Sequence, residues 1–196
     1  WLGRFALGQG GATDRCRAPG TSAFWQYPQR TSVADSCLLA QAATAAPSGA
    51  DILDADKLAQ WMDANVQGFE GPVEVLKFAG GQSNPTYRLN AKSGSYVLRR
   101  KPFGVLLPSA HAVDREYKVI AGLYPTGFPV AKPFGLCTDD SVIGSMFYIM
   151  DMVEGRTIWD GAMPGSNPAE RRATYEAMID TLAALHNVDV ESAGLS

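Results

Sequence analysis

The chain has 196 residues, of which 46% are hydrophobic and 19% are charged. These fractions exclude a wholly disordered chain and leave enough apolar material for a core. The formal net charge of −3 gives no basic field that would favour nucleic acid. No stretch approaches the roughly 18 consecutive apolar residues of a membrane span. We therefore expect neither a nucleic-acid nor a membrane partner.

The first 50 residues differ from the rest in charge and in pattern. Residues 1–50 contain four Arg, two Asp and neither Lys nor Glu, whereas residues 51–196 contain 13 basic and 18 acidic residues. Residues 1–50 also show no sustained hydrophobic period. We therefore expect a leader that is poorly ordered or unrelated to the rest of the chain, with at most a short helix over Leu38–Ala46.

The cysteines are far apart and odd in number, which indicates reduced thiols rather than a disulfide framework or a zinc site. Reduced thiols are typical of a cytoplasmic protein. The Arg-containing leader leaves organellar targeting open as an alternative. The three cysteines are Cys16, Cys37 and Cys137.

An amphipathic helix is expected directly after the leader. Asp54 is a candidate N-cap, and apolar residues follow it at helical spacing. They are Leu58, Trp61, Met62 and Val66.

Three short strands are expected next, over residues 73–79, 86–90 and 96–99. Glycine-containing turns separate them at Gly80–Pro85 and Lys92–Gly94. Because the strands are short and the turns tight, the pattern predicts an antiparallel meander. In the third strand, alternation places Val97 and Arg99 on one face and the residues on either side of them on the other. Those other residues are Tyr96, Leu98 and Arg100.

The second half of the chain predicts two helices around two strands. A helix is expected over Ser109–Leu123, a strand over residues 128–137 and an almost wholly apolar, central strand over Ser145–Met152. A final helix is capped by Asn167. Its apolar stripe is Tyr175, Met178, Ile179, Leu182 and Leu185. This order of elements predicts an α+β fold, with a five-stranded antiparallel sheet and a packed helix on one face.

Four features carry candidate chemistry. Paired glycines in Gly80–Asn84 let a backbone approach an anion closely, although the pattern also fits an ordinary hairpin. Arg99 ends a strand near that loop and suits a phosphate, or is a solvated edge charge. Glu116 lies in the middle of a helix and is otherwise an exposed carboxylate. Met150–Gly155 is typical either of a linker whose backbone reads an adenine edge or of the simple end of a central strand.

Together these features resemble the small lobe of protein-kinase-like folds. More specifically, the chain is similar to the aminoglycoside phosphotransferase and choline kinase-like family, and most to phosphotransferase domains found alone or fused to acyl-CoA dehydrogenases. The resemblance covers about residues 52–196 and rests on five segments in the family's order. They are Phe78–Leu89, Tyr96–Pro102, Ala110–Tyr117, Phe147–Gly155 and Leu182–Asp189.

The resemblance implies a phosphate-binding side of the site. Arg99 falls where the family has its phosphate-binding Lys or Arg, and Glu116 would be its ion-pair partner on the helix. The glycine loop would cover the ATP phosphates, with a hydroxyl and an amide donating to them. The loop residues implied are Gly80, Gly81, Ser83 and Asn84.

The resemblance also implies an adenine side. Met150 would guard the back of the adenine pocket, and Val97 would pack on the ring. The carbonyl of Asp151 and the amide of Val153 would bond the adenine edge. The two histidines, His111 and His186, are expected to be a surface and a structural residue.

Phosphoryl transfer needs more than a nucleotide site. In the family, the catalytic base and the Mg²⁺ ligands come from a His-Gly-Asp…Asn loop and a later Asp-containing segment of the large lobe, and neither histidine of this chain lies in that motif. We therefore expect the lobe that binds ATP, with Mg²⁺ held by the missing half, and no catalytic or metal-binding residue in this chain. The expected parts are a leader at 1–50, a nucleotide-binding lobe at 51–155, and a linker with the first helix of a truncated large lobe at 156–196.

The expected activity of the complete enzyme is transfer of the ATP γ-phosphate to a hydroxyl of a small substrate, and the fragment alone is expected to be inactive. Fused relatives suggest a hydroxyacyl thioester as acceptor, and other relatives suggest aminoglycosides, choline or homoserine. The alternative is a non-catalytic, pseudokinase-like interaction module, which would dimerise through the exposed face that normally meets the other lobe.

Overall fold

The computed structural model describes residues 44–196 except residues 80–83, 105–110, 156 and 159. The strands are β1 (Thr44–Ala45), β2 (Glu74–Phe78), β3 (Thr86–Ala91), β4 (Gly94–Arg100), β5 (Pro133–Cys137) and β6 (Phe147–Asp151). The α-helices are α1 (Ala55–Asn65), α2 (Val113–Leu123) and α3 (Pro168–His186). The strands form one antiparallel sheet in the order β1-β2-β3-β4-β6-β5.

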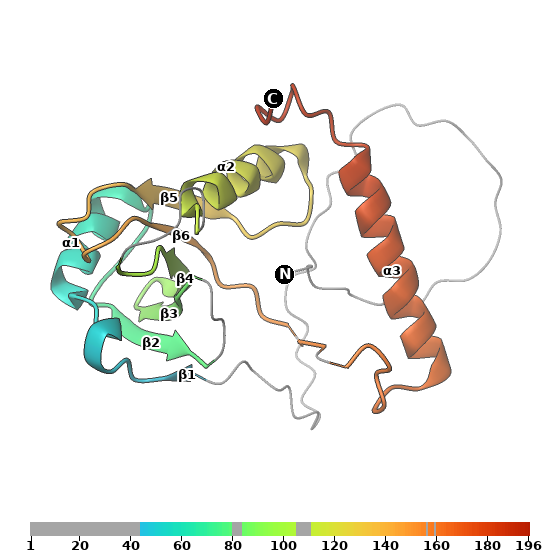
Figure 1. Cartoon of the computed structure of the whole chain (residues 1–196), viewed down its shortest axis with the longest axis horizontal. Coiled ribbons are helices and arrows are strands. Elements are labelled where there is room, and N and C mark those ends of the chain that lie inside the picture. The colour runs from blue at the N-terminus through green and yellow to red at the C-terminus, as the bar shows by residue number, and fades with distance from the viewer. Residues whose placement is uncertain (1–43, 80–83, 105–110, 156, 159) are drawn as a thin grey trace.

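The helices α1 and α2 cover opposite faces of the sheet, and α3 stands apart from it (Figure 1). Helix α1 begins where predicted, because the side chain of Asp54 accepts a hydrogen bond from the N–H of Lys57 at 3.1 Å. Its residues Leu58 and Met62 are fully buried. They pack in a core that includes Tyr87, Leu89, Tyr96, Leu98, Phe147 and Ile149.

A second, smaller core lies between the sheet and α2. It contains Phe78, Val97, Val113, Tyr148 and Met150. Strand β6 supplies side chains to both cores and lies between β4 and β5, which confirms its predicted central position. The alternation predicted for β4 is confirmed too, since Val97 belongs to the α2 side and its chain neighbours belong to the α1 side.

Two predicted boundaries differ from the structure. Helix α2 begins at Val113 rather than Ser109, because His111 has a left-handed backbone with φ of 57° that cannot continue a helix. Strand β5 begins at Pro133 rather than at residue 128, because the N–H of Val130 donates to the carbonyl of Phe128 in a tight three-residue turn.

The sheet also has six strands where five are predicted. The extra strand is β1, whose two residues pair with Phe78 and Lys77 of β2. Thr44 and Ala45 lie in the segment predicted as a leader, so part of that segment joins the sheet. The short helix predicted over Leu38–Ala46 is therefore wrong at these two residues, and its residues up to 43 lie outside those described.

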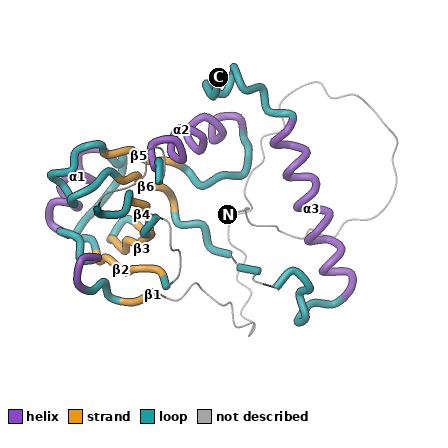
Figure 2. Tube along the Cα trace, in the orientation of Figure 1, coloured by secondary structure: helices purple, strands orange, loops and turns teal. Residues whose placement is uncertain are grey.

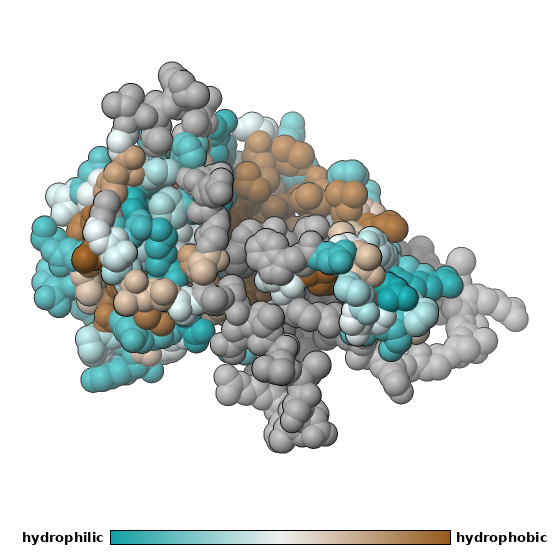
Figure 3. Space-filling view, turned by 60° about the horizontal axis from the view of Figure 1, so that its bottom comes forward, coloured by the Kyte–Doolittle hydropathy of each residue, from teal (hydrophilic) through white to brown (hydrophobic). Residues whose placement is uncertain are grey.

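Helix α3 follows the long connection after β6, drawn mostly as loop in Figure 2. Asn167 caps it as predicted, accepting from the N–H of Glu170 at 2.9 Å. All five residues of its predicted apolar stripe are exposed, from Met178 and Leu185 at 37% to Ile179 at 65%. Figure 3 shows hydrophobic residues gathered in the half of the molecule that contains α3. In the part of the chain that the structure describes, no helix has the length and apolar character to cross a membrane.

The chain after α3 returns to α2. A Cβ atom added to Gly122 in α2 would lie 2.4 Å from the carbonyl oxygen of Ala193 and 3.0 Å from the side chain of Leu195. Only a glycine therefore fits at this contact between α2 and the turn at residues 190–195.

Candidate functional site

The candidate site lies at the end of β4, on the face of the sheet that α2 covers. Arg99 is the next-to-last residue of β4, and Glu116 lies in the first turns of α2. Nε of Arg99 is 2.7 Å from Oε2 of Glu116, and its Nη2 donates to Oε1 at 3.4 Å. The guanidinium group therefore meets the carboxylate side-on as an ion pair, in which Nη2 makes the hydrogen bond and Nε is close to Oε2 without hydrogen-bond geometry.

The neighbouring strands supply the flanks of this ion pair. In the sheet register, Thr86 of β3 and Tyr148 of β6 lie directly opposite Arg99 on its two sides. Nη1 of Arg99 donates to Oγ1 of Thr86 at 3.5 Å, and the hydroxyl of Tyr148 donates to Oε2 of Glu116 at 3.2 Å. Burial, together with the negative charge of Glu116, raises the pKa of the Tyr148 phenol above its ordinary value, so it acts as a donor to Glu116.

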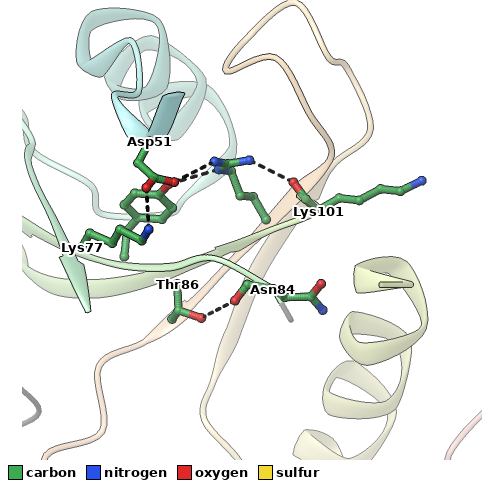
Figure 4. Close-up of polar contacts among 7 residues, drawn as sticks. Asp51, Lys77, Asn84, Thr86 and Lys101 are labelled. Atoms are coloured by element: carbon green, nitrogen blue, oxygen red, sulfur yellow. Dashed lines mark hydrogen bonds and ion pairs between the residues drawn. The ribbon is translucent and has the colours of Figure 1, made fainter. Parts of the chain in front are cut away.

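Asn84 completes the site from the loop before β3. Its side chain is buried, with 4% of the residue's surface exposed. Nδ2 of Asn84 donates to Oε1 of Glu116 at 2.7 Å, and Oδ1 lies 3.0 Å from Nδ1 of His111. Figure 4 shows this amide pointing toward α2, while the backbone carbonyl of Asn84 accepts from Thr86. Both ends of the amide thus have partners within the protein.

The predicted adenine-side residues lie on the same face of the sheet and just beyond it. Val97 is 1% exposed and pairs with Met150 across β4 and β6, so these two side chains line the α2 side together. Asp151 ends β6, and its N–H donates to the carbonyl of Lys132 at 2.8 Å. Val153 follows the strand and is half-buried, and among the described residues none accepts a hydrogen bond from its N–H.

A second ionic cluster occupies the opposite face of the sheet. Arg100 is 2% exposed, and its Nη2 donates to Oδ1 of Asp51 at 3.3 Å. Asp51 also pairs with Nζ of Lys77 at 2.5 Å, and the hydroxyl of Tyr87 accepts from Nε of Arg100 at 3.2 Å. The ring centroid of Phe103 lies 3.9 Å from the Arg100 guanidinium carbon. In Figure 4 this cluster lies on the other side of the sheet from Asn84, which makes it a support behind the site rather than part of it.

The structure brings together several of the residues predicted from the sequence. Arg99, Glu116 and Asn84 form one contact network, whereas Gly80, Gly81 and Ser83 lie outside the described residues.

Three residues of this network are not identified by the sequence: Thr86, His111 and Tyr148. For Thr86 and Tyr148 the signal is the strand register, which becomes readable only once β3, β4 and β6 are aligned on one another. For His111 the signal is its contact with Asn84, since a lone histidine near a helix start has no distinctive sequence pattern.

The described residues do not provide a metal site. Among them, no group of three or more His, Cys, Asp or Glu side chains could hold a metal ion. The carboxylate of Glu116 is already occupied by three donors from protein side chains. What the arrangement offers is a fixed guanidinium group at a strand end, which is suited to an anion with several oxygens.

Comparisons with known proteins show which family the chain resembles. The family model described as "Phosphotransferase enzyme family" matches residues 74–196. A candidate aminoglycoside phosphotransferase from Ralstonia eutropha JMP134, of known crystal structure, is 46% identical, with a TM-score of 0.65 over 74% of this chain and 41% of that chain.

Curated relatives include acyl-CoA dehydrogenase family member 11 from Gallus gallus, 51% identical over 64% of this chain and 16% of the relative. The protein of the same name from Homo sapiens is 44% identical over 71% and 18%. The chain therefore spans less than a fifth of the length of these relatives.

Proposed function

The chain belongs to the phosphotransferase enzyme family, and on that premise we propose that it is the ATP-binding lobe of a small-molecule phosphotransferase. The complete enzyme would transfer the γ-phosphoryl group of ATP to a hydroxyl of a small substrate. The observation that carries this proposal is the side-on ion pair between Arg99 and Glu116, with Nε and Oε2 at 2.7 Å.

The phosphate side of the proposal follows from the donors that this pair leaves available. A guanidinium group has five N–H donors, of which Glu116 faces those on Nε and Nη2. Arg99 keeps 22% of its side chain exposed, and although Nη1 donates one N–H to Thr86, further N–H groups remain for phosphate oxygens. Because the carboxylate fixes the guanidinium orientation before any ligand binds, little further ordering is needed on binding.

The adenine side rests on the end of β6. Met150 is 7% exposed beside Val97, which fits an apolar wall for a base. No described residue accepts a hydrogen bond from the amide of Val153, so this amide is available as the backbone donor that the proposal assigns to the adenine edge. These features fit a nucleotide, and they support ATP as the ligand of this lobe.

The described residues do not fit Mg²⁺, because their acidic, histidine and cysteine side chains form no group that could hold a metal ion. The family's His-Gly-Asp motif does not occur in the sequence, whose only histidines are His111 and His186. We therefore infer that the 196-residue chain by itself binds ATP without transferring its phosphoryl group. The hydroxyl substrate would be bound by residues of the remaining part of the enzyme.

Isothermal titration of the chain with ATP tests the proposal. We expect saturable binding that is lost in Arg99→Ala, and unchanged binding in Arg172→Ala, a matched control on α3 whose side chain is 79% exposed. Adenosine serves as a second ligand, because it lacks the phosphates and should bind both variants alike. Absence of ATP binding by the wild-type chain, or equal binding by Arg99→Ala, would contradict the proposal.

A second candidate function is favoured by one observation, the exposed apolar stripe on α3. Such a stripe suits a non-catalytic interaction module that dimerises with a second copy of the chain. The two candidates differ in a simple measurement, since the module predicts a stable dimer without ATP binding.

A further inference from the structure

The contacts around Arg99 close into a ring of four residues. Arg99 donates to Oγ1 of Thr86 at 3.5 Å, and Thr86 donates to the carbonyl of Asn84 at 3.1 Å. Nδ2 of Asn84 donates to Glu116 at 2.7 Å, and Glu116 returns to Arg99. Each member therefore restrains the next, and the orientation of the Arg99 guanidinium depends on all of them.

Asn84 is the member whose orientation can go wrong. An ionised carboxylate only accepts hydrogen bonds, so the amide end that faces Glu116 must be the nitrogen. If the amide turned over, Oδ1 would face the carboxylate oxygen, and the two acceptors would repel each other. Since Asn84 is 4% exposed, water cannot easily replace the lost donor.

His111 reinforces this amide orientation. Oδ1 of Asn84 only accepts, and it lies 3.0 Å from Nδ1 of His111, so Nδ1 must carry a proton. A donor at this place favours the amide orientation that presents Nδ2 to Glu116. His111 also has a left-handed backbone, with φ of 57°, a conformation that L-residues rarely adopt unless their surroundings compensate.

We propose that Asn84 and His111 are positioning residues for Arg99. Asn84 holds the carboxylate of Glu116 toward Arg99, and His111 fixes the orientation of the Asn84 amide. In this role neither side chain contacts the phosphates. The role therefore differs from the one that the family resemblance implies for Asn84, which is to donate a hydrogen bond to the ATP phosphates. The expected effect of these two residues on ATP affinity rests on the proposed function. The hydrogen-bond arrangement itself does not depend on that function.

Substitutions at residue 111 distinguish the contribution of the Nδ1–H donor from that of the left-handed backbone. Asn tolerates a left-handed backbone, and its Nδ2 can take the place of the histidine Nδ1–H, so His111→Asn should bind ATP within about twofold of wild type. Gly relieves the strained backbone but supplies no donor, so His111→Gly should bind ATP about tenfold more weakly. Adenosine should bind all three proteins equally, and His186→Gly, the same change at an exposed histidine, should leave ATP affinity unchanged.

A merely structural histidine gives a different pattern. Equal ATP affinity of His111→Gly and wild type would overturn the proposal, as would a loss in His111→Asn as large as that in His111→Gly. Asn84→Asp, which places a second carboxylate against Glu116, should weaken ATP binding as well. Asn65→Asp at an exposed position of α1 is its control.

The imidazole tautomer tests the arrangement without any nucleotide. Nitrogen-15 NMR of the wild-type chain near pH 8, where histidine is usually neutral, should show His111 protonated on Nδ1. An Nε2–H tautomer with a bare Nδ1 would overturn the proposal even if ATP binds. If His111→Gly fails to fold, the tautomer still tests the positioning role. If the wild-type chain fails to bind ATP, the tautomer still tests the positioning role as well, but that failure contradicts the proposed function.

Discussion

Arg99 and Arg100 are adjacent in the chain, yet their guanidinium groups lie on opposite faces of the sheet, one paired with Glu116 and the other with Asp51. Alternation along β4 separates them. The first belongs to the candidate site, and the second, at 2% exposure, belongs to the interior. The same substitution at the two arginines should therefore affect the stability of the protein differently.

Arg100→Ala should lower the free energy of unfolding by about 3 kcal/mol, because it breaks a buried ionic cluster and leaves a cavity beside Phe103. Arg99→Ala should cost less stability, since its side chain is partly exposed. Urea denaturation of both variants measures the difference. Comparable losses of unfolding free energy in Arg99→Ala and Arg100→Ala would contradict the different roles assigned to the two faces of the sheet.

The cluster behind the sheet also predicts a dependence on pH. The hydrogen bond from Lys77, with the charges of Lys77 and Arg100, lowers the pKa of Asp51 from its ordinary value of 3.8. A carboxylate whose pKa is lower in the folded state stabilises the fold above the unfolded pKa, and this contribution disappears as the pH falls through the folded pKa. Wild type should therefore lose more stability between about pH 5.5 and about pH 3 than Asp51→Asn.

Unfolding midpoints in urea at the two pH values test this expectation. Asp63→Asn, which removes an exposed carboxylate from α1, is the matched control and should keep the wild-type slope. A slope in Asp51→Asn as steep as that of wild type would assign the acid sensitivity to other groups.

Tyr148→Phe removes the hydroxyl that donates to Glu116 and should cost about 1 kcal/mol of stability at neutral pH. Because the folded state raises the pKa of Tyr148, its stabilisation is present below the ordinary tyrosine pKa of 10.0 and is lost as the pH rises above it. Wild type should thus weaken more than Tyr148→Phe between about pH 9 and about pH 11. Tyr124→Phe, at a 42% exposed residue, should behave like wild type in the same denaturation series.

If α3 mediates pairing of two copies, charges placed in its apolar stripe should prevent association. The double substitution of Ile179 and Leu182 by Glu should give a monomer in sedimentation velocity at concentrations where wild type is a dimer. Both residues are more than half exposed, so the unfolding free energy should change little. Glu at Ala183 and Ala184, which are exposed outside the stripe, should leave the association state unchanged.

Much of the fold can be predicted because local signals agree with the tertiary structure. Asp54 and Asn167 cap helices where short polar side chains precede an apolar period. The two faces of β4 follow from strand alternation alone. By contrast, β1 has two residues and no pattern long enough to read, and its place is set by pairing with β2.

The candidate site is less predictable from the sequence, because its residues lie far apart along the chain. Only a family resemblance identifies Glu116 as the partner of Arg99, since nothing local joins a strand end to a helix 17 residues away. The same resemblance predicts that Asn84 donates to a ligand, which stays a prediction, and its amide contacts with Glu116 and His111 become visible only in the structure. The sequence favours a surface position for His111. Its contact with Asn84 cannot be read from the sequence, because it accompanies a left-handed backbone that the surrounding fold sets.

The contact between Gly122 and Ala193 gives α2 a second attachment at its far end. Gly122 lies six residues beyond Glu116 in the same helix, or about 9 Å along its axis. The turn after α3 therefore contacts the helix that carries the carboxylate of Glu116. The carboxyl-terminal part of the chain thus helps to hold the ion-pair partner of Arg99 in place.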